Sequence, residues 1–333
     1  MTFTYERIHK LVAVLKEQTI LDETPLTDIL YKPCGYKKDN ALPPVDSSWT
    51  FYQEGKRWGG QKDAHCWFYM KVQIENPDCQ LCVRTGLEGE WDATNPQFIA
   101  YVDAELSQGL DVNHTTLPLE PGDHEIYLYA YSGMTDKRLD LFCSLQRLHR
   151  DTQTLYYHLK VLHDICGYLN PNEKNYVDLL GHMERAINLV DFRVFHSPLY
   201  CISVQKAIDY LEKEVYQKGS SEITTVCIGH THIDVAWLWT LAQTREKVQR
   251  SFATAVSLVK RYPEYKFMSS QAVLYQYLKE ECPPLYEQIK QLVKEKRWEA
   301  EGAMWVEADC NLSSGESLIR QILYGKRFFR EEF

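Results

Sequence analysis

Imidazole and carboxylate groups alternate at residues 230–234, and this is the part of the sequence best suited to chemistry. His230, His232 and Asp234 occupy every second position directly after an apolar run. Side chains at i and i+2 of an extended segment point to the same side, so His232 and Asp234 can converge on one metal ion. Trp237 and Trp239 follow closely and offer flat apolar faces. A metal beside an aromatic platform predicts a hydrolase for a hydroxyl-rich substrate.

A third metal ligand is expected farther along the chain, because a catalytic metal takes about three protein ligands and keeps one position open. Asp309 follows another strand-like segment, and parallel strands present their carboxyl ends at one edge of a sheet. His232, Asp234 and Asp309 are therefore the predicted metal ligands. One imidazole and two carboxylates leave the ion acidic enough to bind sugar hydroxyls. The alternative is that His232 and Asp234 only cap the helix that follows.

His230 and the two tryptophans each have two interpretations. The spacing of His230 allows a His230–His232 ligand pair, whereas its place nearer the strand body favours a hydrogen-bonded core histidine. Trp237 and Trp239 could pack on the sheet, and residues at i and i+2 of a helix do not share a face. At most one of the two rings should meet a substrate, and Trp237 is the better candidate for stacking on a sugar.

Composition excludes several classes of function. The chain has 333 residues, 44% of them hydrophobic and 25% charged, which predicts two or three globular domains. Its 37 Lys and Arg against 46 Asp and Glu give a net charge of -9 with no basic run, so we expect no nucleic-acid partner. The first residues lack the apolar core of a signal peptide, and no apolar stretch reaches the length of a membrane span. We therefore expect a cytoplasmic protein without a membrane partner, whose ten scattered cysteines are reduced.

Hydrophobic periodicity divides the chain into four parts. Residues 1–40 form a helix over 3–18 and a turn-rich lead-in, and residues 41–150 form an accessory β-sandwich. Residues 151–220 form a helical connector. The sandwich strands are predicted at 67–74, 81–85, 98–102, 126–131 and 139–145.

Residues 221–333 alternate strand and helix, which predicts parallel βα units and a multi-domain fold of α+β and α/β parts. Strands are expected at 223–229, 265–269 and 298–305. Helices are expected at 241–262, at 273–296 with a break at two prolines, and after the capping sequence 313–316. A complete (β/α) barrel needs roughly 250 residues, so this region is expected to be the first part of a truncated barrel.

Four blocks of this region resemble the α-mannosidases of glycoside hydrolase family 38, in particular their cytosolic and vacuolar branch. The blocks are Gly229–Trp239, Arg250–Phe252, Ser269–Ala272 and Gly302–Glu316, in the order that the family has them. More loosely, residues 108–114 resemble a stretch of the accessory β-domain in the same branch.

The resemblance implies a zinc-assisted retaining glycosidase acting on mannose-containing oligosaccharides. His232 and Asp234 match the family's first two zinc ligands, and Trp237 matches its sugar-stacking tryptophan. Asp309 matches the residue that is both a metal ligand and the nucleophile, whereas His230 falls where this branch has a non-ligand polar residue. The resemblance also implies that the full-length form is a homo-oligomer.

The family's acid/base carboxylate and a further metal-binding histidine are not found in these residues. Glu307 lies too close to Asp309 on one segment to serve as an acid from the opposite side of the sugar. We therefore expect an N-terminal portion of a mannosidase that is inactive alone. Asp111 and His114 receive no catalytic role and are expected to brace a turn or a domain contact.

Two other functions remain open on the sequence alone. A metal-dependent amidohydrolase or carbohydrate deacetylase would use His230 and His232 as a ligand pair. A non-catalytic carbohydrate-binding protein would use the sandwich and a degenerate barrel instead.

Overall fold

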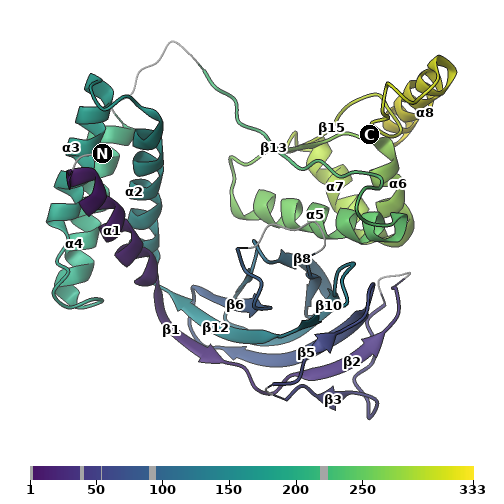
Figure 1. Ribbon diagram of the computed structural model, residues 1–333, viewed down its shortest axis with the longest axis horizontal. Coiled ribbons are helices and arrows are strands. Elements are labelled where there is room, and N and C mark those ends of the chain that lie inside the picture. Colours follow the sequence, from purple (N-terminus) through teal and green to yellow (C-terminus); the bar gives the residue numbers. More distant parts are fainter. Residues whose placement is uncertain (1–2, 38–40, 54, 90–94, 218–223) are drawn as a thin grey trace.

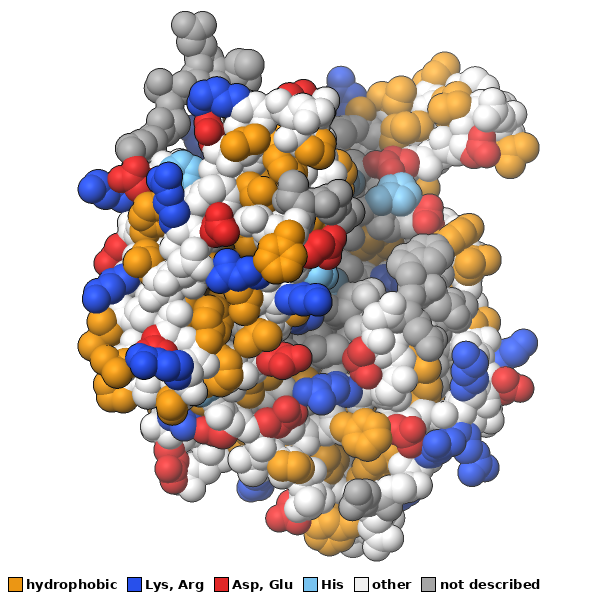
Figure 2. All heavy atoms as spheres, turned by 60° about the vertical axis from the view of Figure 1, so that its left-hand side comes forward, with side chains coloured by type: hydrophobic (Ala, Val, Ile, Leu, Met, Phe, Trp, Pro, Cys, Tyr) orange, Lys and Arg blue, Asp and Glu red, His pale blue; other side chains and the backbone are white. Residues whose placement is uncertain are grey.

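The computed structural model describes residues 3–37, 41–53, 55–89, 95–217 and 224–333. Within them the chain forms a helical bundle, a pair of packed antiparallel sheets and a small parallel α/β unit (Figure 1). The predicted mixture of α+β and α/β parts is confirmed at this level. The face that carries the bundle mixes basic, acidic and hydrophobic side chains rather than gathering one charge (Figure 2).

Two antiparallel sheets form the sandwich. The six-stranded sheet runs in the order β3 (Thr50–Phe51), β2 (Leu30–Cys34), β5 (His65–Ile74), β10 (Gly122–Tyr131), β7 (Gln97–Val102) and β8 (Glu105–Asp111). The four-stranded sheet runs in the order β1 (Ile20–Pro25), β12 (Phe142–Leu148), β6 (Cys79–Arg84) and β9 (Thr116–Leu119). A two-stranded ribbon of β4 (Trp58–Gly59) and β11 (Arg138–Leu139) lies beside them.

The six-stranded sheet is buried on both faces over its central strands. Phe68 and Leu128 point into the core that this sheet shares with Leu81 and Val83 of the other sheet. The opposite face carries a second cluster of mostly aromatic side chains, namely Trp49, Trp67, Tyr69, Ile99, Tyr101, Tyr127 and Tyr129. Six consecutive buried residues at the start of β5 follow from this double burial.

The helical bundle consists of α1 (Phe3–Glu17), α2 (Arg150–Tyr168), α3 (Lys174–Leu189) and α4 (Pro198–Leu211), and a π-helical turn η1 (Glu212–Tyr216) extends α4. Ile8, Val12 and Leu15 form the apolar stripe of α1 and pack into the core of the bundle. Helix α4 begins with Ser197 as its cap and Pro198 in the first turn, a common helix start.

Residues 1–40 are divided between these bodies rather than forming a separate lead-in. Helix α1 joins the bundle, β1 pairs with β12, and β2 pairs with β5. The two strands escape the sequence pattern because β1 is largely exposed and β2 has no clear alternation of burial. Backbone pairing with distant strands, and not side-chain periodicity, makes them strands.

The α/β unit contains the parallel strands β13 (Gly229–His230), β14 (Phe267–Ser269) and β15 (Trp298–Ala300), in this order. Its helices are α5 (Leu241–Arg261), α6 (Ala272–Glu281), α7 (Pro283–Lys294) and α8 (Gly315–Glu332). The expected parallel order is confirmed, and the prolines divide the helix expected at 273–296 into α6 and α7. Phe252, Phe267 and Trp298 form the aromatic centre of its core.

The strands of this unit are shorter than expected. Residue 223 of the first expected strand lies outside the described residues, and residues 224–228 have no regular secondary structure. The third strand was expected to reach Trp305 but ends at Ala300, since Gly302 turns the chain with a φ of 98°. Ser314 caps α8 by accepting from the backbone N–H of Ser317, whereas Glu316 pairs with Arg320.

Helix α5 joins the α/β unit to the sandwich by lying against β8 (Figure 1). Among the described residues, no helix combines the length and the apolar content that crossing a bilayer requires.

Candidate functional site

His232 lies between two carboxylates in the loops that follow the parallel strands. Its Nε2 is 3.0 Å from Oδ1 of Asp234, and its Nδ1 is 3.2 Å from Oε2 of Glu307. The imidazole side chain is 56% exposed and both carboxylates are 41% exposed. Here the structure brings together the predicted pair His232 and Asp234, adds Glu307, and leaves the group open to solvent.

The block Ser269–Ala272 connects the first of these loops with the third. Gln271 is buried, its Nε2 donates to the carbonyl of Ile233 at 2.9 Å, and its Oε1 accepts from the backbone N–H of Glu307 at 3.3 Å. The hydroxyl of Ser270 donates to Oε1 of Glu307. Sequence reasoning gave Ser270, Gln271 and Glu307 no role in the site, although their position after two parallel strands was a usable signal.

The first turn of helix α5 contacts the loop that carries His232 and Asp234. Thr240 caps the helix, and the fully buried Thr244 lies one turn later. The Oγ1 of Thr244 is 3.3 Å from the carbonyl oxygen of Asp234 and accepts from the indole N–H of Trp239 at 3.1 Å. The backbone of Asp234 and the ring of Trp239 are thus both tied to the first turn of α5.

The two tryptophans differ in how much of each ring is accessible. Trp237 is 56% exposed and meets Trp239 edge to face, with ring centroids 5.6 Å apart. Trp239 is engaged with Thr244, and the Nζ of Lys247 lies 4.2 Å from its ring centroid. Residues 235–239 form bends before α5 rather than part of a helix. Trp237 is therefore the more exposed of the two rings.

Asp309 and His230 are not brought into contact with this group. Oδ1 of Asp309 accepts from the backbone N–H of Asn311 at 2.8 Å, and its carbonyl accepts from Ser313 at 3.1 Å. Nδ1 of His230 donates to the carbonyl of Met268 at 3.0 Å, which ties it to β14. Within the described ranges, no three His, Cys, Asp or Glu side chains form a group arranged to hold a metal ion. The metal role of Asp309 therefore stays a prediction.

Asp111 and His114 lie in the sandwich, where they form a turn. Oδ1 of Asp111 accepts from the backbone N–H groups of Asn113 and His114 and from the ring of His114 at 3.0 Å. This agrees with the structural role expected for them. All ten cysteines are free.

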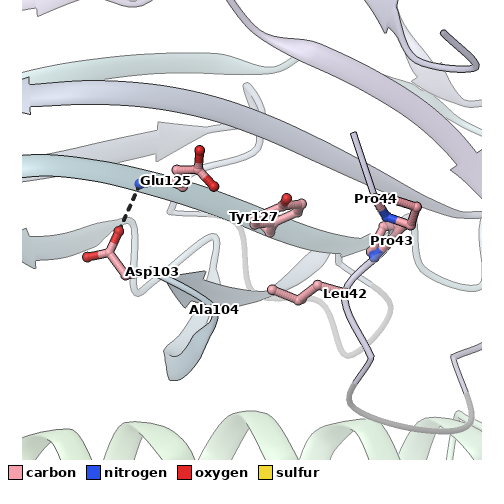
Figure 3. Close-up of a pocket in the computed structure, with 7 residues that line it drawn as sticks. All are labelled: Leu42, Pro43, Pro44, Asp103, Ala104, Glu125 and Tyr127. Carbon is pink, nitrogen blue, oxygen red and sulfur yellow. Dashed lines mark hydrogen bonds between the residues drawn. The ribbon is translucent and has the colours of Figure 1, made fainter. Parts of the chain in front are cut away.

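Two hollows on the described surface lie away from His232. One of about 450 Å³ lies on the sandwich, where Asp103 accepts from the backbone N–H of Glu125 at 2.9 Å (Figure 3). Another of about 430 Å³ lies between the β7–β8 hairpin and helices α5 and α7. Neither is lined by His232, Asp234 or Trp237. The candidate site lies at the edge of the parallel sheet, and its His232, Asp234 and Glu307 side chains are open to solvent.

Comparison with known proteins identifies the region that holds this group. Residues 222–333 match the family model described as Glycosyl hydrolases family 38 N-terminal domain. The chain is 40% identical over 303 residues to "Alpha-mannosidase" of Saccharomyces cerevisiae, which covers 80% of this chain and 27% of that protein. It is 39% identical to "Alpha-mannosidase G" of Dictyostelium discoideum and 33% identical to "Alpha-mannosidase 2C1" of Homo sapiens, and each match covers 56% of this chain and 17% of the relative. The chain therefore spans about a quarter or less of the length of these relatives.

Proposed function

Because this chain belongs to glycosyl hydrolase family 38, we propose that it supplies the metal-binding and nucleophile-bearing part of a retaining α-mannosidase. The observation that carries the proposal is the 3.0 Å contact between His232 and Asp234 at the carboxyl edge of three parallel strands. These residues lie within the stretch that matches the family model. The three strands would be the first of a (β/α) barrel.

The donor set fits a divalent zinc ion. Nε2 of His232 and Oδ1 of Asp234 are an imidazole and a carboxylate ligand, both of which zinc accepts. Oε2 of Glu307 lies 3.2 Å from Nδ1 of His232 and would therefore leave Nε2 as the nitrogen for the ion, the usual arrangement around a metal-bound histidine. Asp309 would complete the ligands. When bound, the ion would hold adjacent sugar hydroxyls and polarise them.

Asp309 would act as the nucleophile. Its Oδ1 accepts from the backbone N–H of Asn311, which fixes the orientation of the carboxylate. The carboxylate would form a bond to the anomeric carbon as the bond to the leaving oxygen breaks. In a retaining enzyme, a second carboxyl group about 5 Å away protonates that oxygen and later activates water. We assign no residue of this chain to that step and expect the chain to be inactive alone.

Trp237 would stack its exposed ring on the mannose ring, with mannose-containing oligosaccharides as substrates. Its 56% exposure beside His232 and Asp234 in the sequence supports this assignment. A cytoplasmic location and a homo-oligomeric full-length form are parts of the proposal that rest on the family resemblance.

Zinc binding and turnover test the proposal separately. Zinc affinity of the 333-residue chain is measured by competition with a chromophoric chelator, and turnover with an aryl α-mannoside. We expect zinc binding that Asp234→Asn and Asp309→Asn weaken, with no turnover. Asp136→Asn, in an exposed loop of the sandwich, is the control.

Two outcomes would revise the proposed function. An unchanged zinc affinity in Asp234→Asn would remove the metal site. Robust turnover that Asp309→Asn abolishes would place the acid/base within these residues.

A further inference from the structure

We infer that the β-sandwich is a positioning element of the candidate site, and that it acts through Glu246 and Arg250 on helix α5. The effect on metal affinity rests on the proposed function. The contact between helix α5 and the sandwich, and its effect on the loop of residues 231–240, are independent of the proposed function.

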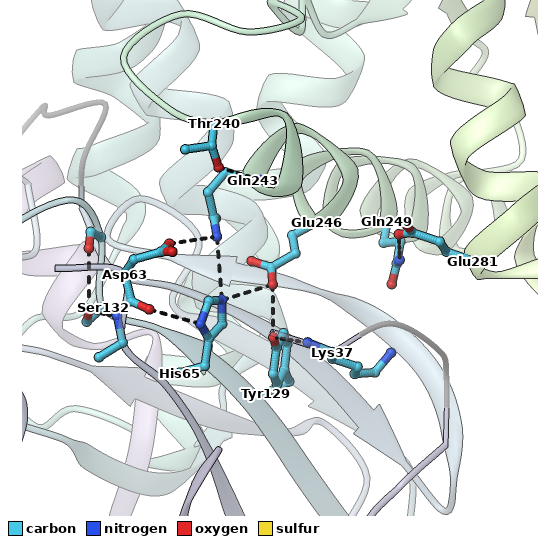
Figure 4. Close-up of polar contacts among 12 residues, drawn as sticks. Lys37, Asp63, His65, Tyr129, Ser132, Thr240, Gln243, Glu246, Gln249 and Glu281 are labelled. Atoms are coloured by element: carbon cyan, nitrogen blue, oxygen red, sulfur yellow. Dashed lines mark hydrogen bonds and ion pairs between the residues drawn. The ribbon is translucent and has the colours of Figure 1, made fainter. Parts of the chain in front are cut away.

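Glu246 anchors α5 on the six-stranded sheet. It is 4% exposed, and its Oε1 lies 3.0 Å from Nε2 of His65 and accepts from the hydroxyl of Tyr129 at 2.9 Å (Figure 4). Nδ1 of His65 faces the carbonyl of Asp63 at 3.1 Å, so each ring nitrogen lies beside an oxygen acceptor. His65 and Glu246 thus form a buried imidazole–carboxylate pair in which each member has hydrogen-bond partners.

Glu246 raises the pKa of His65. Burial alone lowers the pKa of His65, but the hydrogen bond and charge of Glu246, with Asp63, outweigh burial and raise it. Gln243, one turn before Glu246, completes the contact, since its amide lies 3.4 Å from both Nε2 of His65 and Oδ1 of Asp63.

Arg250 makes the second contact, against Gly109 of β8. A Cβ at residue 109 would lie 1.7 Å from Cγ of Arg250, so only glycine allows this approach. The backbone N–H of Gly109 also donates to Oγ1 of Thr254 at 3.0 Å. Burial lowers the pKa of the Arg250 guanidinium, and the charges of Asp111 and Glu246 act in the opposite direction. Residues 108–114 and Arg250–Phe252, two blocks without a catalytic role, thus meet at one interface.

These anchors lie on the helix that holds the loop of the candidate site. Gln243, Glu246 and Arg250 are spaced three and four residues apart, which places them on one face of α5. Thr244, in the same turn as Gln243, contacts the carbonyl of Asp234 and the ring of Trp239. A shift of α5 on the sheet must therefore move Asp234 and Trp239 relative to β14 and β15.

Gly109→Ala tests this coupling because it introduces a steric wedge without changing charge. Gly181→Ala on α3 is the matched control, since a Cβ there meets no atom within 4 Å. Glu246→Gln keeps the size of the side chain and removes its charge. Hydrogen–deuterium exchange of residues 231–240 is measured on the zinc-free chain, zinc affinity by chelator competition, and folding by thermal melting.

We expect Gly109→Ala to speed exchange in residues 231–240 and to weaken zinc binding about tenfold, as supporting residues around metal ligands do. Glu246→Gln should act in the same direction and Gly181→Ala should have no effect. Unchanged exchange in residues 231–240, with faster exchange confined to α5, would overturn the inference and leave a purely structural contact. If Gly109→Ala does not fold, the exchange of residues 231–240 in Glu246→Gln tests the inference instead.

The two hypotheses fail in different ways. A wild-type chain that binds no zinc would refute the proposed function, and the exchange measurement would still decide the coupling. A chain that binds zinc equally in all variants, with unchanged loop exchange, would refute the coupling alone.

Discussion

Two histidines of this chain have similar partners and opposite surroundings. The side chain of His65 is 3% exposed and lies between Glu246 and the carbonyl of Asp63, whereas that of His232 is 56% exposed and lies between Asp234 and Glu307. A buried charge must have its hydrogen bonds satisfied, so the partners of His65 fix one geometry. An exposed imidazole can exchange a partner for a cation at small cost. The comparison indicates that burial distinguishes the structural pair His65–Glu246 from the exposed pair His232–Asp234, for which we propose a metal-binding role.

The largest effect on stability is expected when the buried pair of His65 and Glu246 is broken. Glu246→Ala should destabilise the chain by about 3–5 kcal/mol, because it leaves the charges of His65 and Arg250 buried without their partner. Denaturant unfolding measures the change. Glu316→Ala, which removes an exposed partner of Arg320, should cost less than about 1 kcal/mol. Equal losses in the two variants would contradict the comparison.

Removing the exposed histidine should affect binding and spare stability. His232→Ala is expected to reduce zinc affinity at least about 100-fold, because it removes a proposed ligand, and to change the unfolding free energy by less than about 0.5 kcal/mol, as exposed substitutions do. Chelator competition and denaturant unfolding on the same preparation measure both. A large loss of stability with intact zinc binding would reverse the roles of His232 and His65.

Smaller changes in zinc affinity are expected when residues near His232 are replaced. Glu307→Gln should weaken zinc binding about tenfold, since it loses the charge that orients the imidazole. His230→Ala should leave zinc affinity within about twofold, because His230 is tied to β14. An empty metal site in His230→Ala with an intact one in Asp309→Ala would favour the amidohydrolase or deacetylase instead.

The smallest expected effect is the pH dependence of the buried pair. The pKa of His65 is raised in the folded chain, so the pair stabilises the fold fully below the unfolded value of about 6.5. That contribution is lost as the pH rises through the folded pKa. The stability difference between wild type and His65→Gln should therefore be greater at pH 6 than at pH 9. A difference that grows with pH would mean that His65 is buried in its neutral form.

The local sequence pattern was sufficient to predict the helices and strands whose apolar residues recur at a regular spacing. Helix α5 was expected at 241–262 and spans Leu241–Arg261, and the parallel order of β13, β14 and β15 followed from the alternation of strand and helix. The contact between His232 and Asp234 followed from their spacing, since both lie on one short loop.

The strands β1 and β2 could not be found in this way. Neither shows the alternation of a half-buried strand, and each exists because a distant strand supplies backbone partners. The same limit applies to Glu246, whose partner His65 lies 181 residues earlier in the chain.

The sequence by itself determined which residue types stand at the edge of the parallel sheet and which family they resemble, because a motif and a period are properties of neighbouring residues. Tertiary structure decided which of them meet. Glu307 rather than Asp309 faces His232, since the turn after Asp309 engages its carboxylate with Asn311 while Ser270 and Gln271 draw Glu307 toward the first loop. Only the folded chain placed the sandwich against α5, because that contact depends on a glycine that permits close approach and on polar groups that can be buried only when they are paired.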